Sequence, residues 1–123
     1  MSDTPFLSLI IPAYNEEQRL PQTLRQIADF LAQQPYTAEV LVVENGSRDL
    51  TYAIASDFAN KNLGFKALSS AERGKGLAVR KGMLAAKGTY RMMLDADLSM
   101  PVDQIPRFLP PQLEDVDIAI ASR

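Results

Sequence analysis

The apolar residues of the chain fall into five short continuous runs, separated by segments in which they are spaced more widely. Short apolar runs bounded by turn residues are typical of strands that are buried on both faces of a sheet. The runs predict five strands, over residues 6–12, 38–44, 65–69, 90–94 and 116–121.

Between the runs, apolar residues recur every three or four positions, which is the spacing of one face of a helix. A first helix, ended by Pro35, is predicted from Leu20, Leu24, Ile27 and Leu31. A second helix is predicted from Leu50, Ile54 and Phe58. A third helix is predicted over residues 74–87, and a brief fourth one that begins near Pro101 would be interrupted by Pro106.

Polar residues and glycine mark the ends of these predicted helices. Asn15 is expected to cap the first helix and either Ser47 or Asp49 the second, because short polar side chains accept hydrogen bonds from the free amides of a helix start. Gly88 is expected to stop the third helix, because glycine readily adopts the left-handed conformation found at many helix ends.

The alternation of strands and helices predicts the fold class. It indicates an open, mostly parallel, Rossmann-like α/β sheet with helices on both faces, formed by a single domain over residues 1–123. Ligands of such sheets bind beyond the carboxyl ends of the strands. Polar and unusual residues gather at four of these ends, in residues 12–17, 44–49, 95–99 and 122–123.

Composition limits the chemistry that these strand ends can carry. The 123 residues include neither Cys nor His, so disulfides, thiolate nucleophiles and imidazole bases are excluded. Any metal ion would be a hard cation held mainly by oxygen atoms, such as Mg²⁺ or Mn²⁺. The formal net charge of −2 argues against a general nucleic-acid binder.

The sequence also bears on where the protein works. No apolar run approaches the roughly 18 residues that span a bilayer, and residues 1–6 lack the features of a signal peptide. We therefore expect a cytoplasmic protein with no transmembrane segment in this chain. Peripheral contact with the inner face of a membrane stays open.

Two aspartates one residue apart follow the fourth predicted strand. Asp95 and Asp97 suit a divalent cation, with one carboxylate on the metal and the other on a ligand or a bound water. Without a cation or hydrogen-bond donors, two such carboxylates would repel each other. The alternative is a turn in which an aspartate caps the next helix. The position at a strand end of a parallel sheet favours the metal site.

Two other strand ends offer groups that suit a nucleoside. After the first strand, the ring of Tyr14 can stack on a base, and Glu16 can accept hydrogen bonds from ribose hydroxyls. After the second strand, Glu44 can accept a hydrogen bond from a pyrimidine or a sugar. The alternatives are a plain helix entry at the first site and an ordinary Asn-Gly turn after Glu44. Taken alone, the first segment leaves both interpretations open and the second favours the turn.

A glycine-rich segment, residues 73–76, opens the third predicted helix. Its glycines let backbone amides approach an anion, and Arg73 and Lys75 add positive charge. Its spacing matches neither a Walker loop nor the dinucleotide-binding fingerprint, so the segment is a weak indication of an anion site. Arg123, at the end of the chain, says little by itself.

Taken together, these segments resemble the nucleotide-sugar-binding part of the family-2 glycosyltransferases, which have the GT-A fold. The resemblance covers essentially the whole chain and is carried, in order, by LSLIIPAYNEE, VLVVENGSRDLT, RGKGLAVRKGMLAAKGTY, MMLDADLSMP and IASR. Within the family, the chain is most similar to the polyprenyl-phosphate sugar transferases. The dolichyl-phosphate glucosyltransferase branch is the nearest of these, and the mannosyltransferase branch comes next.

The resemblance implies roles for individual residues. Nucleotide binding is implied for Pro12, Tyr14, Glu16, Glu44, Asn45, Arg73, Lys75, Asp95 and Ala96. Binding of Mg²⁺ or Mn²⁺ is implied for Asp97 above all, and also for Asp95 and Ser99. Catalysis is implied for Asp95, Asp97 and Arg123, of which Arg123 would neutralise the diphosphate leaving group.

The resemblance also implies an activity. This is the inverting, metal-assisted transfer of a hexose, glucose or mannose, from a UDP- or GDP-sugar to a dolichyl-type polyprenyl phosphate. An acceptor phosphate is already anionic at neutral pH and needs no strong general base, which agrees with a chain without His. Two alternatives stay open: transfer to a polysaccharide or other hydroxyl acceptor, and a non-catalytic nucleotide-binding chain. An unrelated doubly wound protein such as a response regulator ranks last, because no Lys follows the fifth strand.

Members of the family continue well beyond the point where this chain stops. The resemblance therefore implies the donor-binding part of a longer catalytic domain, and leaves open whether this part is active by itself. A shortened sheet exposes apolar surface, so association into a homo-oligomer is expected.

Overall fold

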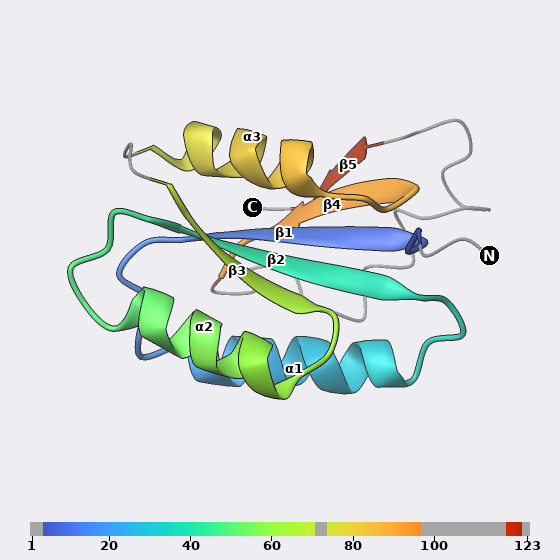
Figure 1. Ribbon diagram of the computed structural model, residues 1–123, viewed down its shortest axis with the longest axis horizontal. Coiled ribbons are helices and arrows are strands. Elements are labelled where there is room, and N and C mark those ends of the chain that lie inside the picture. Colours follow the sequence, from blue (N-terminus) through green and yellow to red (C-terminus); the bar gives the residue numbers. More distant parts are fainter. Residues whose placement is uncertain (1–3, 71–73, 97–117, 122–123) are drawn as a thin grey trace.

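The structure, a computed structural model, describes residues 4–70, 74–96 and 118–121. Within them the chain forms β1 (Leu7–Ala13), α1 (Leu20–Ala32), β2 (Ala38–Asn45), α2 (Thr51–Lys61), β3 (Phe65–Ser70), α3 (Lys75–Ala85), β4 (Tyr90–Leu94) and β5 (Ile118–Ala121) (Figure 1). The five predicted strands are confirmed, each within two residues of its expected bounds. Several predictions lie outside the described residues: the helix near Pro101 and the roles of Arg73, Asp97, Ser99 and Arg123.

The sheet is parallel throughout and has the strand order β3-β2-β1-β4-β5. β1 lies at its centre and is buried along its whole length. The chain adds β2 and β3 on one side of β1, and then places β4 and β5 on the other side. This reversal leaves a crevice between the carboxyl ends of β1 and β4, which is where α/β sheets of this kind bind ligands.

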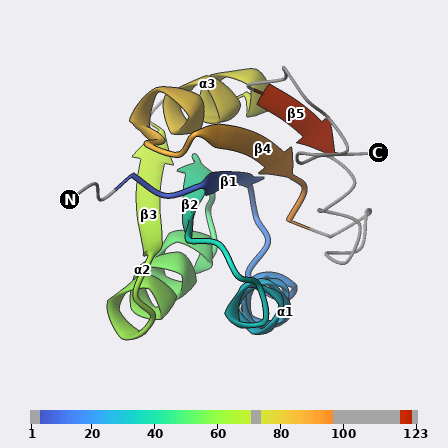
Figure 2. The ribbon, with the colours of Figure 1, turned by 90° about the vertical axis from the view of Figure 1, so that its right-hand side faces the viewer.

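Helices cover both faces of the sheet, as the sequence predicts. Figure 2 shows α1 and α2 on one face and α3 on the other. Successive residues of a strand point to opposite faces, so Ile11 packs in the core under α1 and α2, whereas Ile10 packs under α3. No helix within the described residues is long and apolar enough to cross a membrane.

The predicted stop of the third helix at Gly88 is wrong. α3 ends at Ala85, and Ala86 is already extended. The Gly88 amide donates a hydrogen bond to Ser8 Oγ over 2.8 Å, and a Cβ at position 88 would lie only 2.8 Å from the Ser8 backbone nitrogen. Glycine is therefore required here because the segment before β4 passes close against β1.

Two further predictions at the helix starts, for Asn15 and Leu50, are wrong, and a third is met by one of its two alternatives. Arg19, and not Asn15, immediately precedes α1, and Pro21 lies in the first turn of that helix. Ser47 does not cap α2; of the two predicted alternatives, it is Asp49 that accepts the Thr51 amide, over 3.0 Å. Leu50 precedes α2 and is 63% exposed, so it does not belong to the apolar face of that helix.

Candidate functional site

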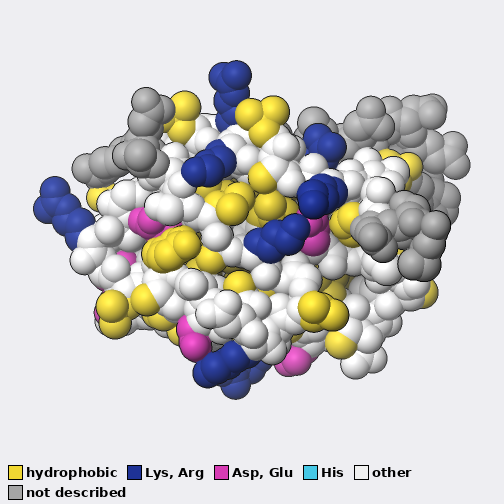
Figure 3. Space-filling model, viewed as in Figure 1, with side chains coloured by type: hydrophobic (Ala, Val, Ile, Leu, Met, Phe, Trp, Pro, Cys, Tyr) yellow, Lys and Arg dark blue, Asp and Glu magenta, His cyan; other side chains and the backbone are white. Residues whose placement is uncertain are grey.

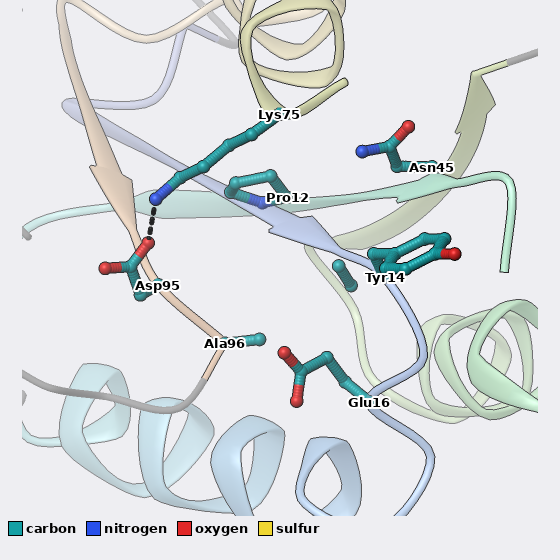
Figure 4. A pocket seen from close by; sticks show the side chains of 8 residues that line it. Pro12, Tyr14, Glu16, Asn45, Lys75, Asp95 and Ala96 are labelled. Carbon is teal, nitrogen blue, oxygen red and sulfur yellow. Dashed lines mark hydrogen bonds and ion pairs between the residues drawn. The ribbon is translucent and has the colours of Figure 1, made fainter. Parts of the chain in front are cut away.

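A cleft of about 330 Å³ opens at the carboxyl ends of β1, β2 and β4. It lies at the point where the strand order reverses, so three strand ends and the start of α3 converge on it (Figure 4). Its walls are formed by Pro12, Ala13, Tyr14, Glu16, Asn45, Lys75, Asp95 and Ala96. The cleft thus combines one aromatic ring, two carboxylates, an amide and an ammonium group.

An ion pair crosses one side of the cleft. Lys75 Nζ lies 2.6 Å from Asp95 Oδ1, and Figure 4 shows the lysine side chain reaching past Pro12 to the aspartate. The Asp95 side chain is only 19% exposed, whereas that of Lys75 is 54% exposed. The carboxylate is therefore held in the wall of the cleft, and the ammonium group reaches it from a solvated, flexible side chain.

The start of α3 is fixed to the end of β2. The Gly74 amide donates a hydrogen bond to Asn45 Oδ1 over 3.0 Å. Gly74 has a φ of 129°, which side-chain-bearing residues rarely adopt, so glycine is needed at this position. The bond holds the first turn of α3, with its unpaired amides and partial positive charge, at the edge of the cleft.

Basic side chains gather on the α3 side of the molecule. Residues 74–94 contain five Lys or Arg and no Asp or Glu, although the whole chain has more acidic than basic residues. Figure 3 shows dark blue side chains clustered over α3 and β4. Of these five residues, only Lys75 lines the cleft, where its ammonium group favours an anionic ligand.

Tyr14 and Glu16 reach the cleft from the loop between β1 and α1. In Figure 4 the Tyr14 ring lies beside Asn45, and the Glu16 carboxylate points toward Ala96. Arg19 Nε lies 3.5 Å from Glu16 Oε1. The aromatic ring and the acceptor oxygens are thus on the opposite side of the cleft from the Lys75–Asp95 pair.

Two loops beside the cleft are joined by five hydrogen bonds, which we call the loop clasp (residues 15–17 and 47–51). The bonds are Asn15 N to Ser47 Oγ (2.9 Å), Arg48 N to Asn15 Oδ1 (2.9 Å), Glu16 N to Thr51 Oγ1 (2.8 Å), Glu17 N to Asp49 Oδ2 (3.2 Å) and Leu50 N to Glu17 Oε1 (2.9 Å). No local sequence pattern predicts this arrangement, because the paired residues are more than 30 positions apart.

Asp49 is the acidic centre of the loop clasp. Burial raises the pKa of its carboxyl, but hydrogen bonds from the Thr51 hydroxyl, the Thr51 amide and the Glu17 amide outweigh this effect. The pKa of Asp49 therefore lies below its ordinary value, and the carboxylate form is the one that the clasp stabilises.

Seven of the nine residues with a predicted nucleotide-binding role line the cleft together: Pro12, Tyr14, Glu16, Asn45, Lys75, Asp95 and Ala96. Glu44 does not line it. Its buried carboxylate accepts hydrogen bonds from the Ser47 amide and, over 3.1 Å, from Ser69 Oγ. Arg73 lies outside the described residues. Ala13 lines the cleft without having been predicted, since an alanine carries no chemical signal.

The oxygen atoms at the cleft are of the type that a hard cation prefers. Asp95 supplies carboxylate oxygens, and Oδ1 already lies against a positive group, the Lys75 ammonium. Within residues 4–70, 74–96 and 118–121, no three acidic side chains lie close enough together to hold a metal ion. Asp97 and Ser99, the other predicted ligands, lie outside this part of the chain.

Comparison with known proteins identifies the class. The model of the family described as "Glycosyl transferase family 2" matches residues 8–123. The chain therefore belongs to glycosyl transferase family 2, and its fold is that of the GT-A glycosyltransferases.

Among curated proteins, the chain is similar to dolichyl-phosphate beta-glucosyltransferases. It is 40% identical to the one from Drosophila melanogaster over 139 aligned residues, covering 100% of this chain and 43% of the relative. It is 36% identical to the one from Homo sapiens over 104 residues, covering 78% of this chain and 32% of the relative. The chain thus spans less than half the length of these relatives.

Two solved structures share the fold. One is the mannosyltransferase PcManGT from Pyrobaculum calidifontis in complex with GDP-Man and Mn²⁺, with a TM-score of 0.64, 27% identity, and coverage of 78% of this chain and 28% of that one. The other is S. aureus TarS 1-349 in complex with UDP, with a TM-score of 0.64, 28% identity, and coverage of 74% and 27%.

Proposed function

We propose that this chain is the nucleotide-sugar-binding part of an inverting glycosyltransferase that transfers a hexose to a dolichyl-type polyprenyl phosphate. The observation that carries the proposal is the cleft, in which seven residues with a predicted nucleotide-binding role meet at the switch point of the sheet. The relatives named dolichyl-phosphate beta-glucosyltransferase favour glucose as the hexose. Mannose is the alternative, supported by the structural neighbour in complex with GDP-Man.

The two sides of the cleft suit the two parts of a nucleotide sugar. The Tyr14 ring can stack on the base, and the Glu16 carboxylate can accept hydrogen bonds from the ribose. Lys75 and the first turn of α3 offer positive charge to the diphosphate. On this account, Lys75 moves from Asp95 to the diphosphate when the donor binds.

The reaction would also use a divalent cation, Mg²⁺ or Mn²⁺. We propose Asp97 and Asp95 as its carboxylate ligands, with Ser99 as a further oxygen donor. Support comes from the oxygen chemistry of the cleft, from the positive group already held at Asp95, and from the Mn²⁺ in the complex of a structural neighbour. When bound, the cation supplies Lewis-acid stabilisation of the charge on the departing nucleoside diphosphate.

The transfer step needs no proton to be removed from the acceptor. An oxygen of the acceptor phosphate forms a bond to the anomeric carbon, while the bond from that carbon to the diphosphate oxygen breaks on the opposite face. The nucleoside diphosphate leaves with the electron pair. Lys75 and Arg123 would offset its charge, which is the electrostatic role that preorganised cations play in such reactions. Because the acceptor is a lipid, we propose that the protein works at the cytoplasmic face of a membrane.

A transfer assay tests the proposed function. The purified chain is incubated with Mn²⁺, dolichyl phosphate and either UDP-glucose or GDP-mannose, each labelled in the sugar. We expect label to enter the organic-extractable lipid from one of the two donors, and Asp97→Asn to abolish this. The matched control is Asp57→Asn, an exposed carboxylate on α2 that should retain full activity. Nucleotide binding without any transfer to lipid would contradict the proposed reaction and leave a nucleotide-binding chain.

A further inference from the structure

We propose that the loop clasp positions Tyr14 and Glu16 for the nucleoside, which makes Asn15, Ser47 and Thr51 positioning residues of the cleft. The inference rests on the proposed function, because it assigns the clasp to the binding of a nucleotide. Its evidence is separate from that for the cleft. It comes from hydrogen bonds that the backbone amides of residues 15–17 donate to side chains of the loop before α2 and of its first residue, Thr51.

Asn15 is held in an unusual backbone conformation between the two cleft residues. Its φ is 52°, and no other non-glycine residue in the described part of the chain has a positive φ. Such a conformation persists when its surroundings fix it. Here the Asn15 amide donates a hydrogen bond to Ser47 Oγ, and Asn15 Oδ1 accepts one from the Arg48 amide. The neighbouring loop therefore holds both the backbone and the side chain of Asn15.

Thr51 fixes the next residue, Glu16. Thr51 is fully buried, and its hydroxyl accepts the Glu16 amide over 2.8 Å while donating to Asp49. Thr51 is also the first residue of α2, a helix that packs on the sheet through Ala55 and Ile54. The backbone of Glu16 is therefore tied to a rigid element, and not only to its own loop.

The clasp is not needed to hold α1 on the sheet. That helix begins at Leu20, and Leu20, Leu24 and Ile27 bury its apolar face in the core. The clasp instead fixes the segment between β1 and α1 that carries Tyr14 and Glu16. A loop that is ordered before its ligand arrives spares the ligand the entropy cost of ordering it, so affinity rises. This is the effect that we assign to the clasp.

The test compares two double variants, one without the two clasp hydroxyls and one that keeps them. Ser47→Ala with Thr51→Val removes both hydroxyls, and Ser47→Thr with Thr51→Ser retains them. The stability control is Ser8→Ala, which removes a buried hydroxyl that bonds Glu39 and the Gly88 amide at the opposite end of β1. Two readouts are collected: hydrogen exchange of the Glu16 and Glu17 amides without ligand, and titration calorimetry with UDP and GDP in the presence of Mn²⁺.

We expect the Ala/Val pair to exchange faster at Glu16 and Glu17 and to bind nucleotide about tenfold more weakly, the size expected for one to two lost hydrogen bonds. The Thr/Ser pair should match the wild type in both readouts. Ser8→Ala should lower the thermal midpoint and leave nucleotide affinity unchanged.

Different failures separate the inference from the proposed function. A wild-type chain that binds neither nucleotide would overturn the proposed function, and the clasp assignment with it. A wild-type chain that binds, together with an Ala/Val pair that binds equally well, would overturn the clasp alone. The same holds if Ser8→Ala weakens binding as much as the Ala/Val pair, because the loss would then reflect general destabilisation.

Discussion

The two ends of the parallel sheet use the same kinds of polar residues for different purposes. At the amino end, Glu39 is buried, and its Oε2 accepts the Ser8 hydroxyl and the Lys87 amide, each over 2.6 Å. At the carboxyl end, the Asp95 carboxylate lies in the wall of an open cleft and pairs with a half-exposed lysine. The Glu39 carboxylate is enclosed by its hydrogen-bond donors, whereas the Asp95 carboxylate faces a space that a ligand can enter.

The difference lies in how readily the partners can be exchanged. Glu39 Oε1 also pairs with the half-exposed Lys66 over 3.5 Å, but its other partners, a backbone amide and a buried hydroxyl, cannot leave without opening the structure. Lys75 can leave Asp95 by rotating a solvated side chain, which is 54% exposed. The comparison predicts that changes at the amino end affect folding, and that changes at the carboxyl end affect binding.

The largest effect is expected from Asp97→Asn. Loss of a second-sphere group at a metal site already lowers metal affinity by about 10- to 100-fold, so loss of a direct ligand should exceed about 100-fold. We therefore expect Mn²⁺-dependent nucleotide binding to disappear in calorimetry. Unchanged UDP and Mn²⁺ affinity in this variant would contradict the metal assignment. The exposed carboxylate variant Asp57→Asn serves as the control.

Glu39→Ala should have the next largest effect, on stability alone. It leaves the Ser8 hydroxyl and the Lys87 amide without their acceptor, which should lower the free energy of unfolding by about 2 kcal/mol. Urea denaturation measures this loss, and calorimetry at a temperature where the variant is folded should show unchanged nucleotide affinity. A weakened affinity would mean that the two ends of the sheet are not separate in function.

Lys75→Met should lower nucleotide affinity and leave stability nearly unchanged, the reverse of Glu39→Ala. Without its ammonium group at the diphosphate, we expect nucleotide affinity to fall about tenfold, as for a lost charge-assisted hydrogen bond. The unfolding free energy should change by less than about 1 kcal/mol, because the side chain is half exposed. Lys61→Met is the control, since Lys61 forms an exposed ion pair with Asp57 within α2 and does not line the cleft. Equal loss of affinity in both variants would contradict a specific role for Lys75.

The smallest effect is expected in the pH dependence of stability. Burial raises the pKa of Glu39, but hydrogen bonds from the Lys87 amide and Ser8 and the charge of Lys66 outweigh it, so the pKa lies below the ordinary value of 4.5. The ionised form is favoured by folding, so this stabilisation is present above pH 4.5 and is lost as the pH falls through the lowered pKa. Urea denaturation between pH 7 and pH 3 should show a shallower decline for Glu39→Gln than for the wild type. Parallel declines would contradict this role.

The strands were predictable because each depends on a local property, a short run of apolar residues that the sheet buries on both faces. Once their alternation with helices had indicated a parallel sheet, the rule for ligand sites directed attention to the strand ends. Asp95, Tyr14 and Glu16 could be found in this way, because each lies within three residues of the end of a strand.

The predictions for Gly88 and Asn15 were wrong because each of these residues contacts a segment that is distant in the sequence. Gly88 reads as a helix stop in the local sequence, but it is required by the close approach of Ser8, 80 positions away. Asn15 reads as a helix cap, but it binds residues 47 and 48 of another loop. The role predicted for Glu44 stays a prediction, and its carboxylate accepts hydrogen bonds from the Ser47 amide and Ser69 Oγ. Hydrogen bonds between segments far apart in the sequence leave no periodic pattern.

We propose that the cleft at the carboxyl ends of β1, β2 and β4 binds a nucleoside diphosphate with the help of a divalent cation. The most direct test is titration calorimetry of the wild-type chain with UDP and with GDP, each with and without Mn²⁺. We expect saturable one-to-one binding of at least one nucleotide, tighter with Mn²⁺ and weaker in Lys75→Met. Absence of binding to both nucleotides, or binding that responds neither to Mn²⁺ nor to Lys75→Met, would contradict it.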